Sequence, residues 1–233
     1  MKPFTRPFRG GNLVFTDLQN IVLQRNHATW SVPNTSGSVG IDRGKMSLNP
    51  PSVKDRTAVI IVDMLNDFVT GSLKCDRAQR IIPPMQKLVE EARKKGVYVI
   101  YSNDAHIKGI DRELELWGDH AIAGTPGAEV IPELAPTGID YVVPKRRYSG
   151  FYGTDLEILL DELKVNTVIM TGLHAHMCVR HTTADAYYRG YNIIVPTDGV
   201  ESFTEEDYLA GIKYLKEVYG AELTTVDELV KRF

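Results

Sequence analysis

The chain has little cysteine, no marked excess of one charge and no long apolar run. Cys75 and Cys178 are the only cysteines in 233 residues, and a chain of this size does not depend on disulfides, so we expect free thiols and a cytoplasmic protein. The formal net charge of -3 argues against a nucleic-acid-binding surface, which is normally basic. No apolar run reaches the roughly 18 residues that span a bilayer, and no signal-peptide core is present, so we expect no membrane partner.

Composition divides the chain into an N-terminal arm, residues 1–54, and a domain, residues 55–233. The arm is rich in Asn, Gly, Ser, Pro and Thr, and the sequence NPPS at residues 49–52 is typical of a linker. Residues 1–50 carry a net charge of +4, which leaves -7 on the remainder. The arm is therefore either a poorly ordered tail or a basic extension that packs on an acidic neighbouring subunit of a homo-oligomer.

The domain alternates strand and helix patterns. Strands are predicted at residues 57–63, 97–101, 140–144, 167–171, 192–196 and 222–226. Helices are predicted from the Pro83-Pro84 pair to Gly96, after a cap at Thr154, from Cys178 onward, and along the apolar stripe between Tyr208 and Tyr219. Repeated strand–helix units predict an α/β fold, a three-layer doubly wound and mostly parallel sheet with helices on both faces.

Three polar residues follow the ends of predicted strands: Asp63, Lys145 and Cys178. Ligands of such sheets bind beyond the carboxyl ends of the strands, where these residues would meet. A cysteine that begins a helix faces free backbone N–H groups and the positive end of the helix dipole, which favour the thiolate. Each residue also has a structural interpretation: Asp63 as a turn cap, Lys145 as a solvated loop lysine and Cys178 as a small buried side chain.

Three motifs contain these residues: VIIVDMLNDF around Asp63, PKRRYSGFYGTDL around Lys145 and TGLHAHMCV around Cys178. Together and in this order they resemble the isochorismatase-like cysteine hydrolases, especially nicotinamidases, over roughly residues 57–226. The resemblance implies that Asp63, Lys145 and Cys178 form a catalytic triad. In that triad a thiolate attacks an amide carbonyl, and a carboxylate takes the thiol proton and returns it to the departing amine.

The resemblance also implies an oxyanion hole and an aromatic pocket. It predicts a cis peptide between Leu173 and His174, with the backbone N–H groups of His174 and Cys178 as the oxyanion donors. His174 departs from the small or β-branched residue expected there in nicotinamidases. Phe68 and Trp117 match positions that enclose a flat substrate ring, although each could instead belong to the core.

A divalent metal site is the next implication. Asp104, His106 and His120, followed by the sequence GTPGAE at residues 124–129, resemble the nicotinamidase metal ligands. One carboxylate and two imidazoles suit zinc best, with manganese or iron as alternatives. Asp104-Ala105-His106 departs from the family's usual Asp-Trp-His, and a loop cap with two surface histidines is the structural alternative. No organic cofactor is expected.

The leading functional hypothesis is a cysteine amidohydrolase that releases ammonia from a small-molecule amide, with nicotinamide as the favoured substrate. An N-carbamoylsarcosine amidase-like enzyme is an alternative that does not need the metal. Isochorismatase-type cleavage of a vinyl ether is disfavoured, because that reaction needs no thiol nucleophile. A non-catalytic binding or scaffold module is the alternative from a different class.

Overall fold

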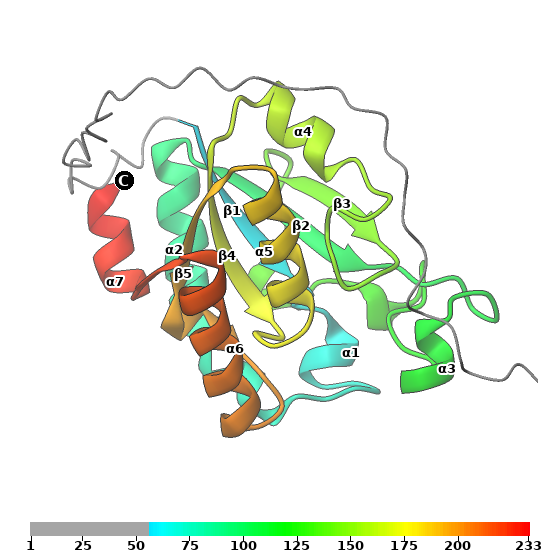
Figure 1. Ribbon diagram of the computed structural model, residues 1–233. Helices are drawn as coiled ribbons and strands as arrows, with labels where there is room; N and C mark the ends of the chain where they lie inside the picture. The colour runs from blue at the N-terminus through cyan, green and yellow to red at the C-terminus, as the bar shows by residue number, and fades with distance from the viewer. Residues whose placement is uncertain (1–55) are drawn as a thin grey trace, which may run out of the picture. The chain divides into compact units, whose positions relative to one another are not determined.

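The computed structural model describes residues 56–233 (Figure 1). The expectations for the arm, residues 1–54, lie outside the described residues. The strands are β1 Thr57–Val62, β2 Tyr98–Asp104, β3 Tyr141–Lys145, β4 Thr167–Leu173, β5 Asn192–Pro196, β6 Val200–Glu201 and β7 Glu222–Thr224. The α-helices are α1 Asn66–Val69, α2 Ile82–Lys95, α3 Glu113–Trp117, α4 Leu156–Glu162, α5 Cys178–Tyr188, α6 Glu205–Tyr219 and α7 Val226–Leu229.

The strands form one seven-stranded sheet in the order β3-β2-β1-β4-β5-β7, with β6 paired to β4. All of these pairs are parallel. The chain first builds the sheet from β1 towards β3 and then returns to β4, on the other side of β1. This is the doubly wound α/β fold that the sequence predicted, and its switch point lies between β1 and β4.

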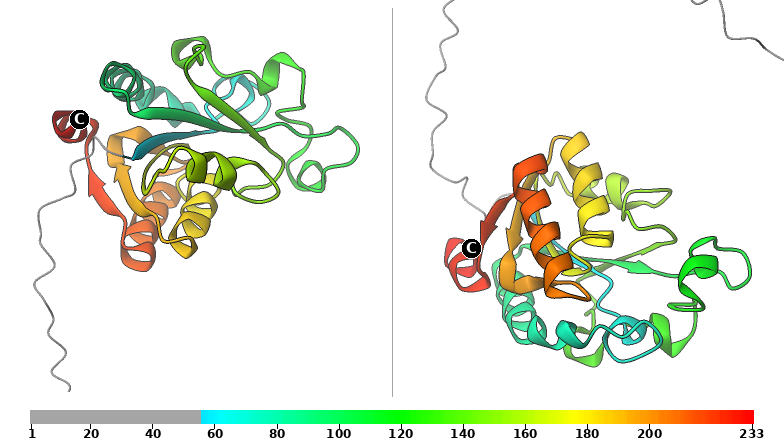
Figure 2. Two further views of the ribbon diagram at one scale, coloured as in Figure 1. Left: turned by 90° about the horizontal axis from the view of Figure 1, so that it is seen from above. Right: turned by 60° about the horizontal axis from the view of Figure 1, so that its bottom comes forward.

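Helices cover both faces of the sheet (Figure 2). Strand β1 is buried along its whole length because alternate residues enter two separate cores. Val59 and Ile61 pack with α2 and α7 in one core. Ala58, Ile60 and Val62 pack with α4, α5 and α6 in the other. This double burial explains why the strand is an almost continuous apolar run.

Several predicted boundaries were wrong. The second strand continues past Tyr101 to Asp104, because its last residues pair with β3, where Asp104 lies opposite Lys145. The fourth strand continues past residue 171 to Leu173, and the last ends at Thr224. Helix α4 takes Asp155 rather than Thr154 as its N-cap residue. Strand β6 and helix α3 were not predicted. The extension of β2 matters for function, since it places Asp104 at a strand end beside Lys145.

Gly172 allows β4 to approach β1 closely at the switch point. Its φ is +97°, and a Cβ atom there would lie 2.0 Å from the carbonyl oxygen of Val62. Only glycine accepts both this backbone conformation and this contact. The two strands whose ends carry Asp63 and the Cys178 loop are therefore held in close register.

Among residues 56–233, no helix is both long and apolar enough to cross a membrane.

Candidate active site

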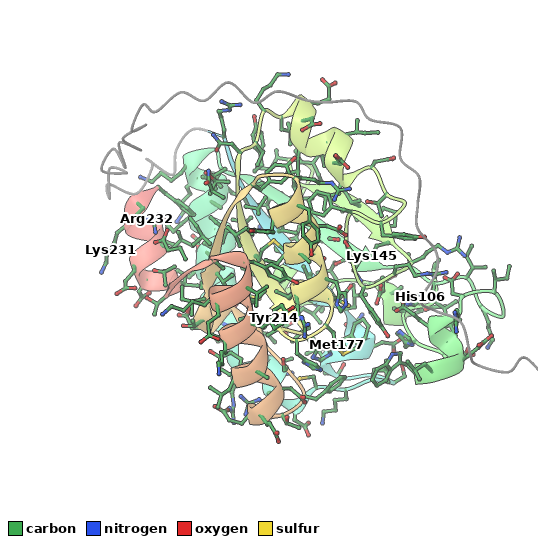
Figure 3. The ribbon with its side chains drawn as sticks, viewed as in Figure 1. His106, Lys145, Met177, Tyr214, Lys231 and Arg232 are labelled. Atoms are coloured by element: carbon green, nitrogen blue, oxygen red, sulfur yellow. The ribbon has the colours of Figure 1, made fainter. Side chains whose placement is uncertain are left out.

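Asp63, Lys145 and Cys178 meet at the carboxyl end of the sheet. Asp63 follows β1, Lys145 is the last residue of β3, and Cys178 is the first residue of α5. Lys145 Nζ lies 2.7 Å from Asp63 Oδ2 and 2.5 Å from Asp104 Oδ1. Cys178 Sγ and one oxygen each of Asp63 and Asp104 all lie within 4.8 Å of one another. Figure 3 shows Lys145, His106 and Met177 on one side of the ribbon, away from Lys231 and Arg232.

Hydrogen bonds to the backbone hold both the main chain and the carboxylate of Asp63. Its φ is +54°, an uncommon conformation for a residue with a side chain that turns the chain sharply at the strand end. Its backbone N–H donates to the carbonyl of Ser102 at 3.3 Å. Its Oδ1 accepts a hydrogen bond from the backbone N–H of Asp104 at 2.8 Å. Asp63 is thus positioned as part of the sheet rather than as a turn cap on the surface.

The buried charges determine one another's protonation. Burial opposes the charge of Lys145, but Asp104 and Asp63 outweigh it and raise the lysine pKa well above its ordinary value. Burial and the nearby charge of Asp104 raise the pKa of Asp63 to about 6. At neutral pH the cluster therefore holds an ammonium between two carboxylates, and Asp63 can exchange a proton near neutrality.

The helix start was expected to favour the thiolate of Cys178, but burial has the larger effect on the thiol pKa. Burial raises the pKa of the thiol well above its ordinary value, and Asp63 and Asp104 raise it further. Lys145 lowers this pKa but does not outweigh burial. The position at the helix start was predicted correctly, yet the thiol carries its proton until a base removes it.

The segment between β4 and Cys178 contains the predicted cis peptide between Leu173 and His174. Ala175 N donates to the Glu201 carbonyl of β6, and Met177 N donates to the His174 carbonyl, each at 2.9 Å. Helix α6 packs directly on this segment at Gly211, where a Cβ atom would lie 2.7 Å from the backbone carbon of Ala175. The backbone of the predicted oxyanion hole is thus supported by β6 and α6.

The three predicted metal ligands also come together. Asp104, His106 and His120 are buried, and each offers one ligand atom within 4.8 Å of the others. His106 Nδ1 lies 3.2 Å from Asp111 Oδ2, and His120 Nδ1 lies 2.8 Å from the Gly118 carbonyl oxygen. Such contacts at Nδ1 leave Nε2 for a metal.

The donor set fits a divalent ion. His106 Nε2 has no hydrogen-bond partner among the described residues and lies 3.6 Å from Asp104 Oδ2. A bound cation would give this buried nitrogen a partner and would also be coordinated by the neighbouring carboxylate oxygen. Two imidazoles and one carboxylate are ligands that zinc accepts.

Glu113 is a further acidic group that the sequence reasoning missed. Its Oε2 lies 3.9 Å from His106 Nε2, and burial and Asp104 raise its pKa to about 7. Asp111, which holds His106 and is paired with Arg146, was also missed. The segment at residues 111–119 contains several acidic residues, and nothing in their spacing distinguished those that turn inward.

A cavity adjoins the triad, and its volume, including the solvent-filled space at its open mouth, is about 350 Å³. The lining residues are Asp63, Phe68, Leu73, Asp104, Glu113, Trp117, His120, Tyr148, His174, Met177, Cys178 and Phe203. Phe68 and Trp117 therefore lie where the sequence placed them, and Trp117 Nε1 donates a hydrogen bond to Tyr148 Oη at 3.0 Å. His181 lies outside the cavity lining; its Nδ1 lies 2.8 Å from the Met177 carbonyl oxygen.

The model of the isochorismatase domain matches residues 57–228. The chain belongs to the isochorismatase family. This isochorismatase-family hydrolase has the fold that its motifs suggested, and Asp63, Lys145 and Cys178 lie together at the ends of its strands.

Solved structures show which members of the isochorismatase family are similar. The N-carbamoylsarcosine amidase of Thermoplasma acidophilum is 41% identical, with a TM-score of 0.70, covering 74% of this chain and 97% of that one. The nicotinamidase PncA of Bacillus subtilis is 32% identical, with a TM-score of 0.70 and coverage of 72% and 99%. A pyrazinamidase of Pyrococcus horikoshii in complex with zinc is 28% identical, with a TM-score of 0.68 and coverage of 73% and 99%.

Proposed function

We propose that this protein is a cysteine amidohydrolase that releases ammonia from a small carboxamide through a thioester. The observation that carries the proposal is the buried ion pair of Lys145 with Asp63, because Asp63 and the Cys178 thiol lie close together in the lining of one small cavity. Nicotinamide, with nicotinic acid as the product, is the favoured substrate, because Phe68 and Trp117 offer flat apolar surfaces in that cavity.

The reaction begins when Asp63 takes the proton of the Cys178 thiol and the sulfur attacks the amide carbonyl carbon. Lys145 stabilises the thiolate as it forms, and the carbonyl oxygen becomes an oxyanion next to the backbone N–H groups of His174 and Cys178. Protonated Asp63 then gives its proton to the leaving nitrogen. The C–N bond breaks, ammonia departs and an acyl thioester remains.

Water completes the reaction. Asp63, ionised again, accepts a proton from the water that attacks the thioester carbonyl. The C–S bond breaks, the sulfur recovers the proton and the carboxylic acid leaves. The raised pKa of Asp63, about 6, suits a group that must both accept and donate a proton near neutral pH.

We propose that a divalent ion, with zinc favoured over manganese or iron, binds to Asp104, His106 and His120. The unpartnered His106 Nε2 and the zinc in the pyrazinamidase relative support this assignment. When bound, such an ion can act as a Lewis acid towards a polar substrate atom. Metal analysis of protein purified without chelator is expected to find about one ion per chain. Protein that contains no metal ion, and that neither binds added zinc nor changes in activity with it, would exclude the assignment.

An N-carbamoylsarcosine amidase-like activity is the second candidate. The 41% identity to the Thermoplasma acidophilum enzyme favours it. This activity would use the same triad on a ureido carbon and would not need the metal site. The structure offers no observation that favours a vinyl-ether substrate.

An ammonia-release screen tests the proposal directly. Nicotinamide, pyrazinamide, N-carbamoylsarcosine and simple ureido compounds are incubated with the enzyme, and ammonia is measured. Release from the pyridine and pyrazine amides supports the first candidate, and release from the carbamoyl compounds supports the second. Stoichiometric thiol labelling without hydrolysis of any amide would instead indicate a binding module.

We also propose that the protein acts in the cytoplasm as a homo-oligomer. Support for the compartment is that both cysteines are free and buried in the structure. The basic charge of residues 1–50 opposite the acidic remainder supports an arm that packs on a neighbouring subunit.

A further inference from the structure

His174 contributes more to the cavity than its backbone N–H. Its side chain is 3% exposed and lines the cavity beside Cys178. Neither ring nitrogen has a hydrogen-bond partner among the described residues. By contrast, His106 and His120, the other two buried histidines of residues 56–233, each have a contact at Nδ1. A buried polar group without a partner is costly, so a ligand or a water molecule is expected to fill these positions.

Aromatic packing holds the His174 ring in place. Phe203 stacks on it with ring centroids 3.9 Å apart and planes inclined by 26°. Phe68 meets it at 87°, with centroids 6.1 Å apart. The stack with Phe203 covers one face of the imidazole, and neither aromatic contact gives a ring nitrogen a hydrogen-bond partner. The ring is therefore fixed without hydrogen bonds of its own, as expected of a preorganised recognition group.

The imidazole is neutral at physiological pH. Burial, reinforced by the nearby His176, lowers the His174 pKa to about 3. A neutral imidazole offers one N–H donor and one bare nitrogen acceptor.

We propose that the His174 side chain is a specificity-determining residue that hydrogen-bonds the non-scissile part of the substrate. It selects an amide with a second hydrogen-bonding group and disfavours apolar analogues. This inference rests on the proposed amidohydrolase function, because it concerns the substrate of that same site.

The His174 ring is separate from the proposed metal site. Phe68 packs edge-on against His120 with centroids 5.6 Å apart and also packs against His174. Selection by His174 can therefore be tested without altering the metal ligands.

The test compares His174→Phe with the wild-type enzyme. Phenylalanine keeps the backbone N–H, the ring and the stacking on Phe203, but removes both nitrogens. Two substrate pairs are used: nicotinamide with benzamide, and N-carbamoylglycinamide with N-isobutylurea, in which an apolar group of similar shape replaces the second amide. In the wild type, the first member of at least one pair should be preferred. In His174→Phe this preference, as a ratio of kcat/KM values, should fall by about tenfold, mostly through KM.

His176→Phe is the matched control. His176 lies on the same segment, but its Nδ1 lies 3.1 Å from Ser202 Oγ and it does not line the cavity. Its replacement should leave the substrate ratios unchanged. His174→Asn and His174→Gln should restore part of the preference, because a neutral amide also donates and accepts. The side-chain amide of Asn can reach the position of Nδ1, and that of Gln can reach the position of Nε2. The variant that restores more of the substrate preference therefore identifies the ring nitrogen that bonds the substrate.

A binding measurement gives a second readout. In a Cys178→Ser background, the imidazole ¹⁵N signals of His174 should show a neutral ring at pH 7 and shift on saturation with the preferred amide. Unchanged substrate ratios in His174→Phe, or ¹⁵N signals that do not shift when the amide is added, would overturn the inference. The proposed amidohydrolase function would not be affected by either result. If the wild type hydrolyses none of the four amides, the proposed function fails first, and the ¹⁵N titration with nicotinamide and N-carbamoylglycinamide decides the inference alone.

Discussion

At the scale of single residues, Cys178 is expected to serve chemistry and not stability. Its side chain is a small neutral thiol in an apolar contact region, so replacement by alanine removes one sulfur atom and leaves no charge unpaired. Cys178→Ala should lower kcat by at least about 10³-fold, because Cys178 is the only cysteine among the described residues that line the cavity. The thermal midpoint should change little. Ammonia release and circular dichroism measure the two effects, and retained turnover would contradict the nucleophile assignment.

Lys145 is expected to serve both chemistry and stability. Lys145→Met leaves the buried carboxylates of Asp63 and Asp104 without their cation. Breaking a buried ion pair in this way costs about 3–5 kcal/mol of the free energy of unfolding. Urea denaturation measures this loss, and an unchanged midpoint would show that the carboxylates take up protons at little cost.

Lys87→Met is the matched control for Lys145→Met. Lys87 Nζ forms an ion pair of the same length, 2.7 Å, with Asp227, but both side chains are exposed. An exposed pair contributes about 1 kcal/mol or less. The contrast between the two variants isolates the effect of burial.

The protonation of Asp63 predicts the pH dependence of the reaction. Asp63 accepts the thiol proton only as a carboxylate, and its pKa is raised to about 6. The value of kcat/KM should therefore increase as the pH rises through about 6 and level off above it. Ammonia-release assays between about pH 4 and pH 8 measure how kcat/KM depends on pH. An activity that is flat through this range would remove Asp63 as the base.

The site shows what single residues could reveal before the fold was known. Asp63, Lys145 and Cys178 were predictable because each follows a recognisable strand, and strand ends of a parallel sheet meet. The protonation of Cys178 was not predictable, because burial raises the thiol pKa and burial is a property of the packed molecule. The neutral state of the His174 ring has the same origin.

At the scale of elements, the contact of α6 with the Ala175 segment predicts an unusual response to mutation. Alanine normally stabilises a helix relative to glycine by about 1 kcal/mol. At Gly211 the added Cβ would lie 2.7 Å from the Ala175 backbone, so α6 or the segment must move. Gly211→Ala should lower both the thermal midpoint and kcat, because the segment carries the His174 and Cys178 N–H groups.

Glu217→Ala is the control for this prediction, since Glu217 is exposed on the same helix. Thermal unfolding and steady-state kinetics should show no loss there. A Gly211→Ala variant as stable and active as the wild type would mean that the segment tolerates displacement.

Elements with strong periodicity were predicted well, and short elements defined by tertiary pairing were not. Strand β1 and helix α2 carry their own apolar patterns. Strand β6 has two residues and exists through its pairing with Gly172 and Leu173 of β4. The last residues of β2 are polar, and their pairing with β3 makes them strand. Such elements have no local signal, because the partner strand stabilises them.

At the scale of the whole molecule, the doubly wound order explains why residues from distant parts of the chain form one site. The connections after β1 and β4 lead to helices on opposite faces of the sheet, which leaves a crevice at the carboxyl ends of these two strands. Alternating strand and helix patterns were enough to predict a doubly wound, mostly parallel sheet, but not the order of its strands. They could not show which loops close the crevice, because α3 and the Trp117–Tyr148 hydrogen bond depend on contacts across that opening.

The same topology predicts that residues 1–50 are dispensable for chemistry. Among residues 56–233, those that line the cavity lie between Asp63 and Phe203, and the family match begins at residue 57. Deletion of residues 1–50 should therefore leave kcat/KM within about twofold of the wild type, while the oligomeric state can change if the basic arm packs on a neighbouring subunit. Kinetics and light scattering after size-exclusion chromatography measure the two properties. Loss of activity in a deletion variant of unchanged subunit number would show that the arm shapes the cavity, since assembly would then be intact and only the site altered.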